Sequence, residues 1–108
     1  MIVTAWNNGK HFKSGAGYGL KLSIEDRDAF FDKSWKTVIL KLPNKSETIE
    51  INIAKPSFWN KICRELISQD IGLWLQSEGW APWTKGKPPK FELVSKGERS
   101  FEVKYIEK

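Results

Sequence analysis

Two lysine-rich segments contain most of the residues in this chain that could carry out chemistry. The first runs from Trp6 to Gly19 (WNNGKHFKSGAGYG) and holds four glycines, two asparagines, two lysines and the only histidine, without any acid. The second runs from Trp80 to Lys90 (WAPWTKGKPPK) and holds three lysines and three prolines, again without an acid. Glycine lets a backbone approach a ligand closely, while asparagine and lysine supply hydrogen-bond donors. Both segments favour the binding of an anionic ligand, although ordinary surface loops can share this composition.

The positive charge of the chain is concentrated in the same two regions. The net charge is +5, of which residues 1–24 contribute +3, residues 79–91 contribute +3 and the remainder −1. The lysines concerned are Lys10, Lys13, Lys21, Lys85, Lys87 and Lys90. Acid-free basic segments are the footprint expected for binding a polyanion such as nucleic acid. The alternative is that these lysines only solvate two loops.

An enzyme would need a reacting group, and the sequence offers no convincing one. His11 is a single imidazole, and no nucleophile elbow is present. Gly15, Gly17 and Gly19 are spaced wrongly for a phosphate loop or a dinucleotide motif. The acids that follow Ser23 fit a helix N-terminus better than a metal site, and the basic segments lack the carboxylates that a metal-dependent nuclease needs. We therefore expect no enzyme, no catalytic residue, no metal site and no cofactor.

Length and cysteine content indicate a single intracellular domain. The 108 residues suffice for one domain with its own core. The lone Cys63 cannot form an internal disulfide, and its place beside Ile62 and Leu66 in an apolar stripe predicts a buried thiol. No apolar run approaches the roughly 18–20 residues that cross a membrane, and the N-terminus lacks the features of a signal peptide. The expectation is a cytoplasmic protein without a membrane partner.

Alternating apolar residues predict six strands in an α+β arrangement. The expected strands are Ile2–Trp6, Tyr18–Ile24, Trp35–Leu42, Thr48–Ile53, Phe91–Ser95 and Ser100–Ile106. The middle two and the last two are expected to form hairpins. Two hairpins and few helices favour a largely antiparallel, barrel-like open sheet with the helices covering its ends.

Two helices are expected between these strands. A short one covers Glu25–Asp32, begins at a cap on Ser23 and turns both of its phenylalanines to the core. A longer one begins at Pro56, and its apolar stripe continues to a glycine cap at Gly79. Asp70 and Gly72 are candidate break points in this longer helix.

The six tryptophans divide into two groups. Those in apolar patterns, expected in the core, are Trp35, Trp59 and Trp74. Those that flank the lysine-rich segments are Trp6, Trp80 and Trp83. A ring in the second group could stack on a base or sugar, anchor a partner protein, or pin a loop to the body.

A family resemblance appears towards both ends of the chain, in TAWNNGKHFKSGAGYGLKLSIEDRDAFF and in KGKPPKFELVSKGERSFEVKYI. These segments resemble the DNA-binding pseudobarrel shared by plant B-three transcription factors and the effector domains of certain type II restriction endonucleases. The matching pieces are Asn7-Asn8, Ser14-Gly15 and Gly19–Leu22, followed by the turn, strand and hairpin that close the domain. The likeness covers roughly two thirds of the chain and departs from the pattern between Ser57 and Glu78.

The resemblance implies two arms that grip the major groove of duplex DNA from opposite sides of the barrel. The first arm would contain Asn7, Asn8, Lys10, His11, Lys13 and Ser14, and the second would run from Thr84 to Lys90. The lysines would neutralise phosphates, while Asn7, Asn8 and His11 would reach base edges. Neither arm contains an arginine, the commonest reader of guanine, so we expect weak binding or reading assisted by a partner.

Three functions are open on the sequence. The favoured one is a nucleic-acid-binding domain, for which double-stranded DNA is the expected ligand and a nuclease or a regulator a candidate protein partner. A protein-interaction module would instead use the segment from Trp80 to Trp83 as an aromatic anchor with a charged rim. A small enzyme acting on an acidic or nucleotide substrate would depend on His11.

Overall fold

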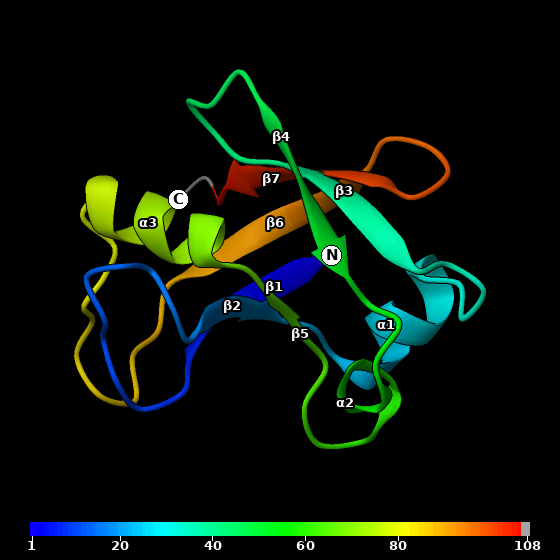
Figure 1. Cartoon of the computed structure of the whole chain (residues 1–108), viewed down its shortest axis with the longest axis horizontal. Helices are drawn as coiled ribbons and strands as arrows, with labels where there is room; N and C mark the ends of the chain where they lie inside the picture. The colour runs from blue at the N-terminus through cyan, green and yellow to red at the C-terminus, as the bar shows by residue number, and fades with distance from the viewer. Residues whose placement is uncertain (107–108) are drawn as a thin grey trace.

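The computed structural model describes residues 1–106. Within these residues, seven strands form one mixed sheet that curls into a nearly closed barrel (Figure 1). The strands are β1 (Ile2–Asn7), β2 (Tyr18–Lys21), β3 (Thr37–Lys41), β4 (Thr48–Asn52), β5 (Glu65–Ile67), β6 (Lys90–Ser95) and β7 (Ser100–Tyr105). Their order is β4-β3-β7-β6-β1-β2-β5, and the two outer strands, β4 and β5, approach each other. Every hydrogen-bonded pair is antiparallel except β3 with β7, which run parallel.

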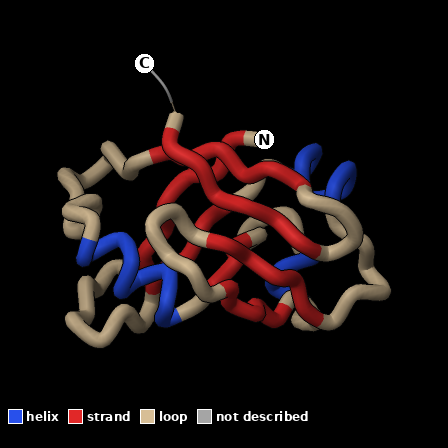
Figure 2. The backbone as a smooth tube through the Cα atoms, turned by 90° about the horizontal axis from the view of Figure 1, so that it is seen from above, coloured by secondary structure: helices blue, strands red, loops and turns tan. Residues whose placement is uncertain are grey.

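The three helices in the described residues are short and lie at the two ends of the barrel. They are α1 (Ile24–Phe30), α2 (Pro56–Trp59) and α3 (Gln69–Ser77). Both views place α3 at one end and α1 with α2 at the other, with the strands between them (Figure 1, Figure 2). In the described part of the chain, no helix is long and apolar enough to cross a membrane.

The α+β class and both hairpins are confirmed, whereas the strand count and the strand directions are corrected. The β3–β4 and β6–β7 pairs are the predicted hairpins. The sheet has seven strands where about six were expected, and the sheet expected to be largely antiparallel contains one parallel pair. The additional strand is β5, which lies inside the stretch predicted to be the longer helix.

The prediction of one longer helix from Pro56 to Gly79 is wrong, because this stretch divides into α2, β5 and α3. Asn60, which follows α2, is extended, and Arg64 has a φ of 66°, so this connection is not helical. β5 then pairs with β2, and Leu66 lies opposite Leu20. Gly19 permits this approach, since a Cβ at that position would lie 2.5 Å from the Leu66 carbonyl oxygen. Pairing with a distant strand therefore overrides the helical spacing of the apolar residues.

The apolar stripe assigned to that helix is correspondingly broken up. Ile62 is 76% exposed, and Cys63 is half-buried where a buried thiol was expected. Asp70 and Gly72 lie inside α3 and are not break points. The end of α3 follows the prediction, because Gly79 has a φ of 80° and takes the chain out of the helix.

The short helix α1 begins directly after Ser23, the residue predicted to cap it. The Ser23 hydroxyl accepts a hydrogen bond from a backbone N–H of the first turn at 3.1 Å. Only one of the two phenylalanines reaches the core, since Phe31 is buried and Phe30 is 45% exposed. The buried Arg27 donates to the Phe58 carbonyl at 3.1 Å and thereby ties α1 to α2.

The core lies inside the barrel and is filled by the alternating residues of the strands. Fully buried examples are Val3, Leu20, Val38, Leu40, Leu93 and Val103. Trp74 of α3 is also fully buried, as predicted. Trp35 and Trp59 are only partly buried, and they pack against the edge of this core.

Candidate functional site

The two lysine-rich segments lie side by side at the α3 end of the barrel (Figure 1). We call residues 8–17, between β1 and β2, the first arm, and residues 80–89, between α3 and β6, the second arm. Neither contains a helix or a strand, as predicted. β1 is antiparallel to both β2 and β6, so the starts of β2 and β6 meet the last part of β1. This sheet order places both arms at one end, and not on opposite sides of the barrel as the family resemblance implies.

An aromatic cluster joins the two arms. The His11 and Trp83 rings lie edge to face, with 5.3 Å between their centroids and 82° between their planes. Tyr18, at the start of β2, lies 5.3 Å from His11 and 5.9 Å from Trp83 on the same measure. The buried Tyr18 hydroxyl hydrogen-bonds to Nδ1 of His11. His11 and Trp83 therefore have a structural role in joining the arms to the body, whatever they bind.

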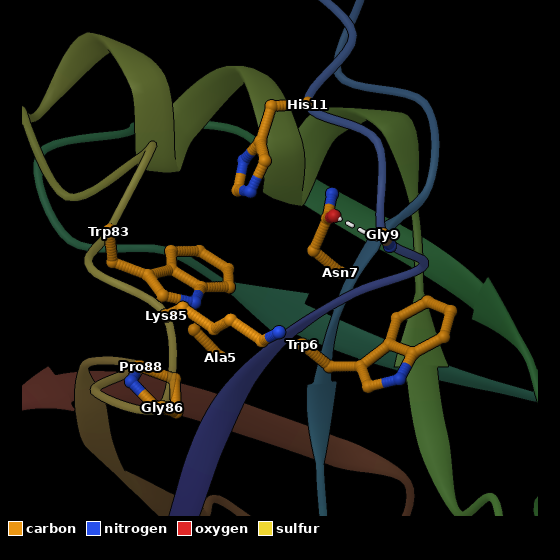
Figure 3. Close-up of a pocket in the computed structure, with 9 residues that line it drawn as sticks. All are labelled: Ala5, Trp6, Asn7, Gly9, His11, Trp83, Lys85, Gly86 and Pro88. Atoms are coloured by element: carbon orange, nitrogen blue, oxygen red, sulfur yellow. Dashed lines mark hydrogen bonds between the residues drawn. The ribbon is translucent and has the colours of Figure 1, made fainter.

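A cleft of about 620 Å³ opens between the arms and β1. Its lining residues are Ala5, Trp6, Asn7, Gly9, His11, Trp83, Lys85, Gly86 and Pro88. In Figure 3 the His11 ring points down between the arms towards Trp83, and the Lys85 side chain reaches across towards β1. The Trp6 indole lies on the other side of β1 from Trp83. The cleft thus combines aromatic rings from both arms with a lysine ammonium group.

The two asparagines at the start of the first arm hold its shape. The Asn7 amide nitrogen donates to the Lys10 carbonyl at 2.8 Å, and its oxygen accepts from the Gly9 N–H at 2.8 Å. The Asn8 side-chain oxygen accepts from the Lys10 N–H at 3.1 Å. The nearby Ser14 hydroxyl faces a backbone N–H of its own turn at 3.4 Å. These groups are engaged within the arm, so base reading by Asn7 and Asn8 stays a prediction.

Helix α3 supports the first arm through contacts that the sequence analysis missed. Gly15 and Gly72 are in backbone contact, since a Cβ on Gly72 would lie 2.2 Å from the Gly15 carbonyl oxygen. The side chains of Gln69 and Gln76 donate to the carbonyls of Ser14, at 2.7 Å, and Phe12, at 2.6 Å. A glycine in the middle of a helix was the one available signal, because such a glycine often marks close packing. The first arm is consequently held in one position before any ligand binds.

Most of the predicted lysines are free to meet a ligand. Five of them are exposed, and none has an acidic partner within salt-bridge distance among residues 1–106. These five are Lys10, Lys13, Lys85, Lys87 and Lys90. The free cationic groups therefore belong to the two arms and to the first residue of β6.

Lys21 is separated from this group. It ends β2 at the edge opposite the first arm, and its Nζ lies 3.6 Å from a carboxylate oxygen of Glu65 on the neighbouring strand β5. Glu65 is buried, with 5% of its surface exposed. Because this ion pair neutralises Lys21 away from the arms, the structure does not bring Lys21 into the candidate site.

Glu78, Tyr105 and Asn44 form a hydrogen-bonded polar cluster outside the arms. The Glu78 carboxylate accepts hydrogen bonds from the Tyr105 hydroxyl at 2.7 Å and the Asn44 amide at 2.9 Å. These bonds, the one from Tyr105 first, lower the pKa of Glu78 below its ordinary value of 4.5. Burial, and then the bond to Glu78, raises the pKa of Tyr105. This exposed cluster links the end of α3 to the strands and contains no free cation.

Comparison of the chain with protein-family models, with curated proteins and with solved structures finds no match. Within the described residues, no group of three histidine, cysteine, aspartate or glutamate side chains is placed to hold a metal ion. The site consists of two cationic arms, one of them firmly anchored, on either side of an aromatic cleft. Such a surface can attract a polyanion and can accept a flat ring.

Proposed function

We propose that this domain binds nucleic acid, and double-stranded DNA above all, by holding the phosphate backbone with its two arms. The observation that carries the proposal is the set of five exposed lysines, four on the arms and Lys90 at the start of β6, which have no acidic partner within residues 1–106. Lysines that neutralise phosphates release condensed counterions, and this release drives binding to a polyanion. The contact of Gly15 with Gly72 supports the proposal, because a pre-positioned arm loses less conformational freedom on binding.

We further propose that the open barrel is a DNA-binding pseudobarrel. The arms of this chain lie next to each other at one end of the barrel, so both would meet the same stretch of duplex. Lys10 and Lys13 would contact phosphates from the first arm, and Lys85 and Lys87 from the second. The domain would act in the cytoplasm as a binding subunit, without catalytic activity of its own, beside a nuclease or a regulator.

A protein-interaction module built on the second arm is the competing function. Trp80 is 38% exposed, but its ring packs edge to face on Phe91 with 5.2 Å between centroids. Trp83 is half-buried in the aromatic cluster. Since both indoles are engaged with the body, they offer little free apolar surface to a protein partner, and we rank this function second.

Fluorescence anisotropy of a labelled DNA duplex, titrated with the protein at two salt concentrations, tests the proposal. We expect binding that weakens steeply with salt and is lost in Lys10→Glu and Lys87→Glu. Lys36→Glu is the matched control, because Lys36 is exposed and belongs to the connection between α1 and β3, and α1 lies at the other end of the barrel from the arms. An absence of binding to duplex and single strands at about 50 mM salt would refute the proposal. Capture of a protein partner that depends on Trp80 would then favour the competing function.

A further inference from the structure

The cleft between the arms contains more than phosphate binding requires. Neutralising a DNA backbone needs only exposed cations, whereas this cleft has aromatic rings from both arms and a volume of about 620 Å³. That volume falls within the range of about 300–1,000 Å³ typical of small-ligand sites. His11 and Trp83 are also held in fixed positions by the buried Tyr18. The cleft is thus a prepared site for a flat ring.

The surroundings of the cleft indicate which flat ring it would accept. Lys85 lines the cleft, and Lys10 and Lys87 are exposed on the arms that form its two sides. The arms contain no acid, so a ring attached to phosphates is favoured over a neutral or cationic one. A nucleobase has such phosphates on either side of it, and every base has a face that can stack on an aromatic side chain.

Resting on the proposed function, we infer that the cleft binds one unpaired nucleobase of the bound DNA. A base inside an intact duplex shows only its edges, because its faces are covered by its neighbours. A base that has left the stack exposes a face, and it can enter a pocket at low cost when it was already unpaired. The arms hold the flanking phosphates while Trp83 and His11 contact the base.

The polar groups that face the cleft are mainly donors. We assign to His11 the tautomer in which Nδ1 accepts from the Tyr18 hydroxyl, so that the ring proton resides on Nε2 and makes it a donor. The Lys85 ammonium group is a donor in every state. Two donors suit a base edge rich in acceptors, such as N7 and O6 of guanine. An unpaired guanine is therefore the expected first choice.

The test compares two labelled duplexes of the same sequence, one fully paired and one with a single unpaired guanine opposite an abasic position. Wild type should bind the second duplex about ten-fold more tightly, which is within the range that stacking of one base on an aromatic side chain provides. Trp83→Leu keeps apolar bulk against the core but removes the indole, and it should abolish this preference, so that both duplexes bind the variant with equal affinity. Lys87→Ala should lower the affinity for both duplexes by the same factor and keep the preference for the duplex with the unpaired guanine. Melting curves confirm that each variant is folded.

A second measurement does not depend on any variant. A 2-aminopurine placed at the unpaired position of the duplex should lose fluorescence on binding wild type, because the base stacks on the indole. Equal affinity for both duplexes, with unchanged 2-aminopurine fluorescence, would overturn the inference and leave the two-arm proposal standing. Failure to bind any DNA would overturn both. Binding of deoxyguanosine monophosphate without binding of any oligonucleotide would identify a free nucleotide as the occupant and would also overturn both.

Discussion

The salt dependence of DNA binding follows from the number of free lysines on the arms. Each phosphate neutralised in duplex DNA contributes about −0.9 to the slope of log affinity against log salt concentration. Five lysines, four on the arms and Lys90 at the start of β6, lack an acidic partner within residues 1–106, so the steepest slope that they support is about −4.5. Raising the salt concentration from about 50 to 200 mM should then weaken binding by up to roughly 500-fold.

Two matched glutamine variants show whether the five lysines that are unpaired within residues 1–106 are the ones that contact DNA phosphates. Lys87→Gln removes a free cation from the second arm and should reduce the slope by about 0.9. Lys21→Gln removes a cation of the same type that pairs with Glu65 at 3.6 Å, outside the arms. Glutamine can still donate a hydrogen bond to the buried Glu65, so this variant should keep both its fold and the wild-type slope.

The measurement is an anisotropy titration of a short labelled duplex at four or more salt concentrations for the three proteins. A wild-type slope near zero would refute the assignment of the arms as phosphate contacts. An equal loss of slope in Lys21→Gln and Lys87→Gln would show that the charge of the whole molecule, and not the placement of the arm lysines, governs binding.

Two further predictions concern stability. Gly72→Ala would place a Cβ 2.2 Å from the Gly15 carbonyl oxygen, and we expect it to lower the free energy of unfolding by about 1–3 kcal/mol and the melting temperature by about 4–8 °C for each kcal/mol. Ser77→Ala, on an exposed position of the same helix, is its control, and equal melting temperatures for the two variants would contradict the packing argument. In folded protein the pKa of Glu78 is depressed below 4.5, so its stabilising contribution is present above about that pH and is lost as the pH falls through the folded-state value. Tyr105→Phe removes the main cause and should flatten the fall of melting temperature with acidity below pH 4.5, whereas superimposable pH profiles of variant and wild type would contradict this.

Local signals in the sequence predicted the elements whose causes are local. The β3–β4 hairpin follows from alternating apolar residues, and the start of α1 follows from a cap on Ser23. The two arms were recognisable as irregular, basic segments, because glycine and proline disfavour regular structure wherever they cluster. In each case, residues within a few positions of one another contain the whole cause.

Contacts between distant segments account for what the sequence analysis missed. The residues of β5 have apolar spacing that suits a helix, and only pairing of Leu66 with Leu20 on β2 makes them a strand. The contact of Gly15 with Gly72 joins residues far apart in the chain, and each glycine alone has several possible explanations. A pattern within one segment of the sequence cannot predict such a pairing, because the free energy of the contact depends on both segments together.

For the candidate site, the amino-acid sequence was enough to identify the groups concerned, which are two acid-free segments, their lysines, the single histidine and the neighbouring tryptophans. Which of these groups meet depends on how the chain folds. The position of β1 between β2 and β6 brings the arms together, closes the cluster of His11 with Trp83, and opens the cleft. The pairing of β2 with β5 neutralises Lys21 and removes it from the site. Composition sets which charges exist, but strand order sets their neighbours, and charges act only on neighbours within a screening length of about 10 Å.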